Sequence, residues 1–262
     1  MPPDPRPTLQ DLRTRIRQIE TGGGPPQRVL PFGLPVIDHH LPGGGLPLGA
    51  VHEVSDGDVG PSHIAAATLF VAGIVARASG PVLWCLRMPD LYAPALAQVG
   101  LEPDRVIYGE APDERMLPLL IEEGLRHRSL AVVVGELSRL PMVASRRLQI
   151  AAEQSGVTAV LLRRRPQSAT AEFSQPTASL TRWRVTALPS TSPLVTGPVP
   201  GIGRPRWRVE LVRCRSGKVG EWELEGCDAT GRLCLPAQMA HRPAARDGQA
   251  GTGPSYAERR VG

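Results

Sequence analysis

Two patterns of hydrophobic and polar positions divide the chain, and the first predicts alternating strands and helices. Short segments of strand character occur at residues 51–55, 81–86, 105–108, 130–134 and 157–162. The segment 130–134 is continuously apolar, as is typical of a strand buried on both faces. Segments of helical character separate these strand segments, at residues 62–79, 91–99, 113–127 and 141–154. Asp113 is the expected N-cap of the third helix. This rhythm predicts an α/β fold, with a mostly parallel sheet and helices on both faces.

After residue 165 the pattern changes to an alternation of apolar and polar positions. Residues 166–179 are polar and predict a loop, whereas residues 181–187 alternate as a strand. Within the segment 206–235, residues 207–213 and 219–225 alternate across a short Ser-Gly-Lys turn and predict an antiparallel hairpin. Residues 231–235 are a candidate third edge strand. The sequence therefore predicts C-terminal antiparallel strands beside the parallel core.

The two ends of the chain differ from the core, which we place at residues 28–240. Residues 1–27 predict a short amphipathic helix and a Gly/Pro-rich linker, and residues 241–262 predict a disordered tail. The apolar face of the helix consists of Leu9, Leu12, Ile16 and Ile19. A helix of this length is marginal alone in water. Its apolar face therefore needs a surface, either on its own domain or on an interaction partner.

Composition limits the class of protein. Of the 262 residues, 41% are hydrophobic and 21% are charged, which is enough apolar material for a core. The longest apolar run, residues 64–76, is too short to cross a bilayer, and the N-terminus has no apolar signal-peptide region. The spacings of Cys214, Cys227, Cys234 and His241 do not match those of zinc sites. We therefore expect a cytoplasmic protein with reduced thiols and no metal.

The charge balance favours an anionic partner. The formal net charge is +5 and the isoelectric point is about 9.5, as in proteins that contact nucleic acid. Lys218 is the only lysine among the 30 basic residues, so arginine carries nearly all of the positive charge. A GC-rich genome would produce the same bias toward arginine.

A glycine-rich segment between residues 33 and 54 is the most informative motif of the sequence. It combines glycines at positions 33, 43, 44, 45 and 49 with Asp38 and with the strand residues Val51, Glu53 and Val54. This run resembles the entry to the ATPase core of the RecA family, where it leads into the phosphate-binding loop. The resemblance extends over residues 28–235 and implies a RecA-like core.

The loop that follows lacks the groups that hold a nucleotide in that family. A phosphate-binding loop has the pattern G-x-x-x-x-G-K-[ST], in which backbone N–H groups and a lysine contact phosphates and a hydroxyl binds Mg²⁺. The corresponding segment here has no lysine, Asp58 adds negative charge, and Pro61 removes a backbone donor. The degenerate loop consists of Asp56, Gly57, Gly60, Pro61, Ser62 and His63.

Two further positions differ from those that the RecA family uses for catalysis. The strand that ends in the Mg²⁺-ordering Asp of the family ends here in Gly135, followed by Glu136 as a candidate substitute ligand. Residues 86–88, Leu-Arg-Met, replace the acid that activates water in the family. We therefore predict that the protein is not an ATPase and has no nucleotide cofactor, so that the glycine loop only turns the chain.

Together these features resemble the ImuA family, the RecA-like and SulA-related proteins of bacterial damage-inducible mutagenesis cassettes. The narrower match rests on residues 41–54, the lysine-free loop leading into 65–70, the strand 80–85 and the tract 157–166. The resemblance implies a non-catalytic accessory role in SOS-induced translesion DNA synthesis. It also implies as partners an ImuB-like Y-family polymerase homologue, an error-prone polymerase complex and RecA.

Two other functions stay open on the sequence alone. The RecA-like fold and the positive charge are consistent with a single-stranded-DNA-binding ATPase or filament module. The resemblance to SulA-related proteins is consistent with a SulA-like inhibitor of cell division. The segment 163–182 corresponds to the DNA-contacting loop of RecA-like recombinases, where clustered guanidinium groups could neutralise phosphates. The candidate contacts to DNA or a partner are Arg163, Arg164, Arg165, Arg213 and Arg215. The alternative for each is a solvated basic surface.

Overall fold

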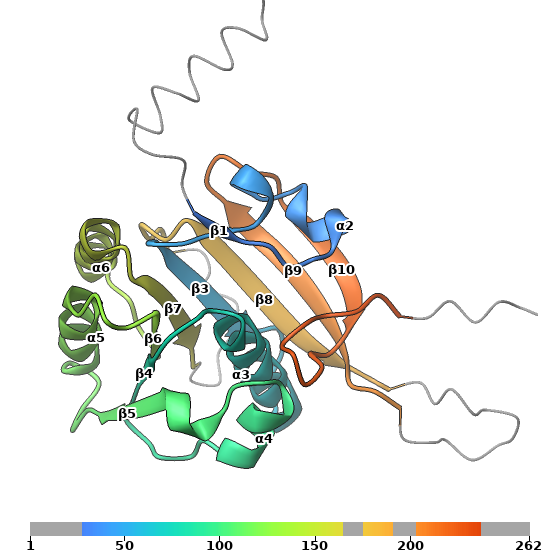
Figure 1. Ribbon diagram of the computed structural model, residues 1–262, viewed down its shortest axis with the longest axis horizontal. Helices are drawn as coiled ribbons and strands as arrows, with labels where there is room; N and C mark the ends of the chain where they lie inside the picture. The colour runs from blue at the N-terminus through green and yellow to red at the C-terminus, as the bar shows by residue number, and fades with distance from the viewer. Residues whose placement is uncertain (1–27, 165–174, 191–202, 237–262) are drawn as a thin grey trace, which may run out of the picture.

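A computed structural model describes residues 28–164, 175–190 and 203–236, and within these ranges eight strands form one sheet (Figure 1). The strand order is β10-β9-β8-β3-β7-β6-β4-β5. The N-terminal helix with Leu9, Leu12, Ile16 and Ile19, the tail 241–262 and Arg165 lie outside the described residues. The boundaries of the core at residues 28 and 240 therefore stay predictions.

The parallel part of the sheet contains the five strands predicted before residue 165 and the strand that follows residue 179. Its members are β3 (Val51–Asp56), β4 (Val82–Leu86), β5 (Val106–Glu110), β6 (Val132–Leu137), β7 (Thr158–Arg163) and β8 (Thr181–Leu188). Every neighbouring pair from β8 to β5 is parallel. The predicted α/β fold is confirmed.

The antiparallel part continues the sheet beyond β8. The predicted hairpin is formed by β9 (Arg206–Cys214) and β10 (Gly220–Glu225), and β8 pairs with β9 through a bulge at Arg182/Trp183. The predicted third strand at residues 231–235 is wrong, because this segment makes only an isolated bridge between Glu225 and Cys234. Before this segment the chain turns, because the Asp228 carboxylate accepts hydrogen bonds from the backbone N–H groups of Thr230 and Arg232.

Helices cover both faces of the sheet, as predicted. On one face lie α3 (Pro61–Ala76) and α4 (Ala93–Gln98), and on the other lie α5 (Leu117–Arg126) and α6 (Met142–Ser155) (Figure 1). Successive side chains of a strand point to opposite faces. In β6, accordingly, Val132 and Val134 pack with the α3 side, whereas Val133 and Leu137 pack with the α5 side.

The helix α5 begins at Leu117 rather than at the predicted Asp113. The Asp113 carboxylate does cap backbone N–H groups, those of Arg115 and Met116, but it closes a turn that precedes the helix. Pro118 explains the difference. A proline is tolerated in the first turn of a helix, and a start at Asp113 would have placed it in the interior, where its ring clashes with the carbonyl four residues earlier.

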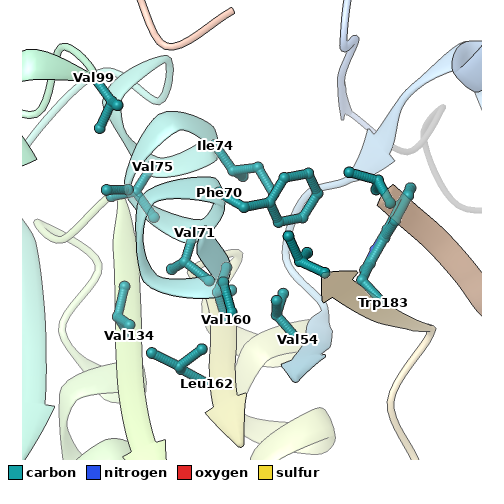
Figure 2. Packing of buried hydrophobic residues seen from close by; sticks show 14 of the residues in the cluster. Val54, Phe70, Val71, Ile74, Val75, Val99, Val134, Val160, Leu162 and Trp183 are labelled. Carbon is teal, nitrogen blue, oxygen red and sulfur yellow. The ribbon is translucent and has the colours of Figure 1, made fainter. Parts of the chain in front are cut away.

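The larger part of the hydrophobic core lies between α3 and the sheet (Figure 2). There Phe70 of α3 packs on Trp183 of β8 with ring centroids 5.8 Å apart, and Phe32 lies 5.3 Å from the same tryptophan. Val71 and Val75 point toward the central strands from the same helix. In the part of the chain described here, no helix has the length and apolar character needed to span a membrane.

A small second sheet closes one end of the core. It pairs β1 (Val29–Leu30) with β2 (Leu46–Pro47), and the glycine-rich segment between them contains the short helix α2 (Pro35–Asp38). His52 joins this unit to the main sheet, because its ring nitrogens hydrogen-bond to Pro47 O and Thr181 Oγ1, each at 2.7 Å. Burial lowers the pKa of His52 to about 4, so the imidazole is neutral at physiological pH.

We expect Phe70→Ala to lower the free energy of unfolding by about 3–5 kcal/mol, because it removes a fully buried ring and leaves a cavity against Trp183. Chemical denaturation followed by tryptophan fluorescence measures the change. Tyr92→Ala is the matched control, since Tyr92 is 69% exposed and its removal should change stability by no more than about 0.5 kcal/mol. Equal effects of the two substitutions would contradict this assignment of the core.

Candidate functional site at the carboxyl edge of the sheet

The carboxyl ends of β3, β7, β6 and β4 meet at one edge of the sheet, the place where open α/β folds usually bind ligands. Four chain segments contribute side chains there. They are the loop 57–60 after β3, Asp90 after β4, Glu136 near the end of β6 and Arg164 directly after β7. The predicted nucleotide loop and the predicted arginine tract are thus brought to the same edge.

The loop after β3 is held against β8 by its own contacts. Gly57 N donates a hydrogen bond to Val185 O at 2.8 Å, and any side chain at Gly57 would collide with that of Thr186. In the first turn of α3, His63 Nδ1 accepts a hydrogen bond from Ala187 N at 3.1 Å. Close approach to β8 therefore explains the glycine at position 57.

The remaining loop positions turn the chain from β3 into α3. Gly60 is the residue before the helix, and its φ of 137° favours glycine. Pro61 is the first helical residue, where the missing N–H costs no helical hydrogen bond. Asp56 is buried at the end of β3, whereas Asp58 and Ser62 are exposed. These residues have the geometry of a strand-to-helix connection.

The end of β6 contains Gly135 and Glu136, the two positions that the sequence analysis compared with the acid of the RecA family. Gly135 points to the α5 face, where a side chain would collide with Ile121, so a carboxylate there would not face the glycine loop. Glu136, the predicted candidate for a substitute ligand, points to the opposite face, which α3 covers.

The Glu136 carboxylate is buried and has two partners. Trp84 Nε1 donates to Glu136 Oε1 at 2.8 Å, and Arg164 donates through Nε to Oε2 at 2.8 Å and forms an ion pair through Nη2 at 2.7 Å. Burial raises the pKa of Glu136, and the neighbouring Arg164 guanidinium opposes this rise. Both carboxylate oxygens are thus occupied by groups of this chain.

Asp90 extends the ion pair into the loop after β4. Arg164 Nη2 lies 3.2 Å from Asp90 Oδ1, and the Asp90 side chain is 55% exposed. One guanidinium therefore joins the loops that follow β4 and β7 to the end of β6. No sequence pattern singled out Asp90, because it lies in the loop after β4, four residues beyond the end of that strand.

The predicted arginine tract does not form one exposed cluster. Arg163 is buried, and its Nη2 donates to Ser138 O at 3.0 Å. Arg164 is engaged with two carboxylates, and Arg165 lies outside the part of the chain that the structure describes. Side chains of consecutive residues at a strand end point to opposite faces of the sheet. Arg163 and Arg164 therefore point in different directions and do not form one exposed cluster.

A second buried carboxylate, Glu53 of the glycine-rich motif, organises the other face of the sheet. Glu53 Oε1 accepts hydrogen bonds from the Thr177 and Ser179 hydroxyls and forms an ion pair with Arg182 Nε at 3.4 Å. Arg182 also donates to Gln175 O at 2.6 Å. This network fixes residues 175–179, where the chain enters β8.

The two predicted hairpin arginines have different surroundings. Arg213 Nη1 donates to Thr177 O at 2.9 Å and so supports the segment that Glu53 holds. Arg215 is exposed, and its backbone N–H donates to Leu180 O at 2.8 Å. Within the described ranges no three His, Cys, Asp or Glu residues form a group that could hold a metal ion. His241, whose spacing to the cysteines did not match that of a zinc site, lies beyond these ranges.

Comparison with known proteins identifies relatives of this chain. No family model matches the sequence. Two curated proteins, both named Protein ImuA and both from strains of Caulobacter vibrioides, are each 40% identical to it over 222 residues. The alignment covers 80% of this chain and 88% of each relative.

We expect Arg164→Met to lower the free energy of unfolding at pH 7 by about 1–3 kcal/mol, because it leaves the buried Glu136 carboxylate without its ion pair. The pH dependence gives a sharper test. A carboxyl group whose pKa is raised in the folded state reduces stability as pH rises from its unfolded pKa through its folded pKa. Loss of Arg164 raises the pKa of Glu136 further, so unfolding free energy should fall more steeply with pH.

Urea denaturation between about pH 5 and 8 measures these slopes. The control is Arg164→Met combined with Glu136→Gln, which has no carboxylate to ionise and should lose the additional slope. If wild-type and Arg164→Met proteins gave equal slopes, the ion pair would not control the charge of Glu136.

Proposed function

The chain belongs to the ImuA family of damage-inducible mutagenesis cassettes, and we propose that it acts there as a non-catalytic adaptor in translesion DNA synthesis. One observation carries this proposal beyond family membership. The carboxyl edge of the sheet, where a RecA-like ATPase would hold its nucleotide, is filled by contacts among side chains of this chain. Such an edge suits a scaffold better than an enzyme.

The groups at this edge do not suit Mg-ATP. The carboxylates of Glu136 and Asp90 face the Arg164 guanidinium, which supplies the positive charge that a metal ion would otherwise supply. Opposite them, the phosphate-binding loop has Pro61 instead of a lysine beside its last glycine, and Gly57 packs against Thr186. Phosphate binding needs several free backbone N–H groups and a cation. We therefore propose that the protein works without a nucleotide.

The proposed partner is the ImuB-type Y-family polymerase homologue, together with the error-prone polymerase complex of the cassette. Family membership supports this partner, and a rigid core without its own chemistry is consistent with a role in assembly. RecA is a further proposed contact on the same basis. Direct contact with single-stranded DNA through residues 163–165 has less support, because Arg163 is buried and Arg164 is paired.

Calorimetric titration with Mg-ATP tests the nucleotide part of the proposal. We expect no binding heat up to millimolar ATP, with an active RecA-type ATPase as the positive control. We also expect no ATP binding by Pro61→Lys, which restores a G-K-S sequence. The Arg164–Glu136 pair and the packing at Gly57 are unchanged in this variant. Micromolar binding by the wild-type protein would contradict the assignment of this edge as a filled site.

Co-expression with the cognate ImuB-type protein tests the adaptor part. We expect a complex that survives size-exclusion chromatography at moderate salt. Arg164→Met should retain the complex if it folds, because the proposed role of Arg164 is internal. Failure of the wild-type chain to co-purify with this partner would count against the adaptor function. Single-stranded-DNA binding or filamentous cells on overexpression would instead favour the alternative functions.

A further inference from the structure

Several apolar side chains on and beside α5 and α6 are exposed. The two helices lie side by side and are joined by the ion pair of Arg147 in α6 with Glu122 in α5 at 2.6 Å. On α6, Val143 and Ile150 are seven positions apart and share one outward face, with Met142 next to Val143; on α5, Leu119 is exposed three positions after Met116, the residue before the helix. These side chains are Met116, Leu119, Met142, Val143 and Ile150. Together with the arginines named below, we call them the α5–α6 surface.

Arginines without carboxylate partners lie among and beside these apolar side chains. In the described structure Arg126 and Arg147 pair with Glu122, and Arg126 also pairs with Glu123. Four exposed arginines in or next to the two helices have no carboxylate within ion-pair distance among the described residues, namely Arg115, Arg128, Arg139 and Arg146. Arg146 lies three positions after Val143 and four before Ile150, so it shares their face of α6 and the surface combines apolar side chains with arginines.

An open hollow of about 300 Å³ lies between the two helices, and most of the residues that line it are polar. The lining consists of Glu122, Arg126, Arg128, Arg147, Ile150, Ala151, Gln154 and Ser155. The hollow therefore offers guanidinium groups beside one exposed apolar side chain, Ile150, and is not a dry apolar pocket.

We propose that the α5–α6 surface is the docking site for an acidic amphipathic segment of the polymerase homologue, an inference that rests on the adaptor function proposed above. Apolar side chains at helical spacing would cover Val143, which is 74% exposed, and Ile150 beside the hollow. Carboxylates of the same segment would pair with the four arginines that have no carboxylate partner. The chemistry required of the partner is therefore an amphipathic segment that presents apolar and acidic side chains together.

Charge and polarity argue against two other occupants. Nucleic acid would use the arginines but would leave the apolar side chains uncovered and would meet the carboxylates of Glu122 and Glu123. The N-terminal segment of a second copy has a suitable apolar pattern, but residues 1–27 contain more arginines than carboxylates. The arginines of such a segment would be repelled by the arginines of the α5–α6 surface.

The test uses the full chain and a set of overlapping 20-residue peptides that cover the cognate ImuB-type protein, with the intact protein as a second probe. Binding is measured by fluorescence polarisation. One variant combines Val143→Glu with Ile150→Glu, and a second combines Arg139→Glu with Arg146→Glu. The matched controls are Val219→Glu at the β9–β10 turn and Arg232→Glu in the segment after β10, which change exposed residues away from α5 and α6 (Figure 1).

We expect an acidic amphipathic peptide to bind the wild-type chain, and each α5–α6 variant to weaken peptide and intact partner by about 10-fold or more. The controls should stay within about 2-fold, and binding should weaken with added salt. Thermal melting establishes that each variant is folded. If a glutamate variant unfolds, Val143→Ala with Arg146→Ala replaces it and should weaken binding in the same direction.

The outcomes separate this inference from the adaptor function. If the wild-type chain binds the intact partner and the α5–α6 variants bind it equally well, the surface assignment is overturned and the adaptor function stands. If the wild-type chain does not bind the partner at all, both fail. If the variants lose affinity for single-stranded DNA and keep their affinity for the partner, the surface belongs to nucleic acid and the inference is wrong.

Discussion

A carboxylate buried at the end of a parallel strand has to be neutralised, and this constraint shapes the carboxyl edge of the sheet. Burying a charge without a partner costs several kcal/mol, so the Glu136 side chain needs a cation. Arg164 supplies it from the end of the neighbouring strand β7 and also reaches Asp90 in the loop after β4. Three strand ends are thereby joined by one guanidinium. In a nucleotide-binding protein of this fold, a metal ion and the phosphates of the nucleotide would have to balance the charge of a carboxylate at this strand end.

The other buried carboxylate, Glu53, follows the same logic on the opposite face. It collects two hydroxyls and Arg182 from the segment that leads into β8, and so determines where this segment meets the sheet. The two ion pairs, Glu136 with Arg164 and Glu53 with Arg182, lie on either side of residues 165–174. Each fixes one end of the connection from β7 to β8. A core whose connecting segments are fixed by internal charge pairs can serve as a rigid platform without a bound ligand.

The fold and the function of this protein are therefore separate questions. A parallel sheet with a glycine-rich first loop supports ATP hydrolysis only if specific groups are present at its edge, and a fold alone does not imply an activity. Here Glu136, Asp90 and Arg164 at the edge are paired with one another, whereas exposed apolar side chains lie next to arginines without carboxylate partners on and beside α5 and α6. The proposed docking surface accordingly lies on the helices and not at the sheet edge. Partner binding, rather than chemistry, is what this distribution of polar and apolar groups favours.

Sequence pattern by itself determined the α/β class, the positions of the first five strands of the main sheet and the hairpin, because the spacing of apolar residues shows which segments form strands and helices. It also placed the glycine loop and Arg164 at strand ends. Tertiary structure decided the rest. Whether Gly135 or Glu136 faces the loop depends on the face to which each residue of β6 points, and a shift of one residue reverses that face. Asp90 and Arg164 are 74 positions apart in sequence and meet only because β4 and β7 end at the same edge. The α5–α6 surface likewise exists only after two separate helices have packed together, since neither helix alone determines which of its apolar residues remain uncovered.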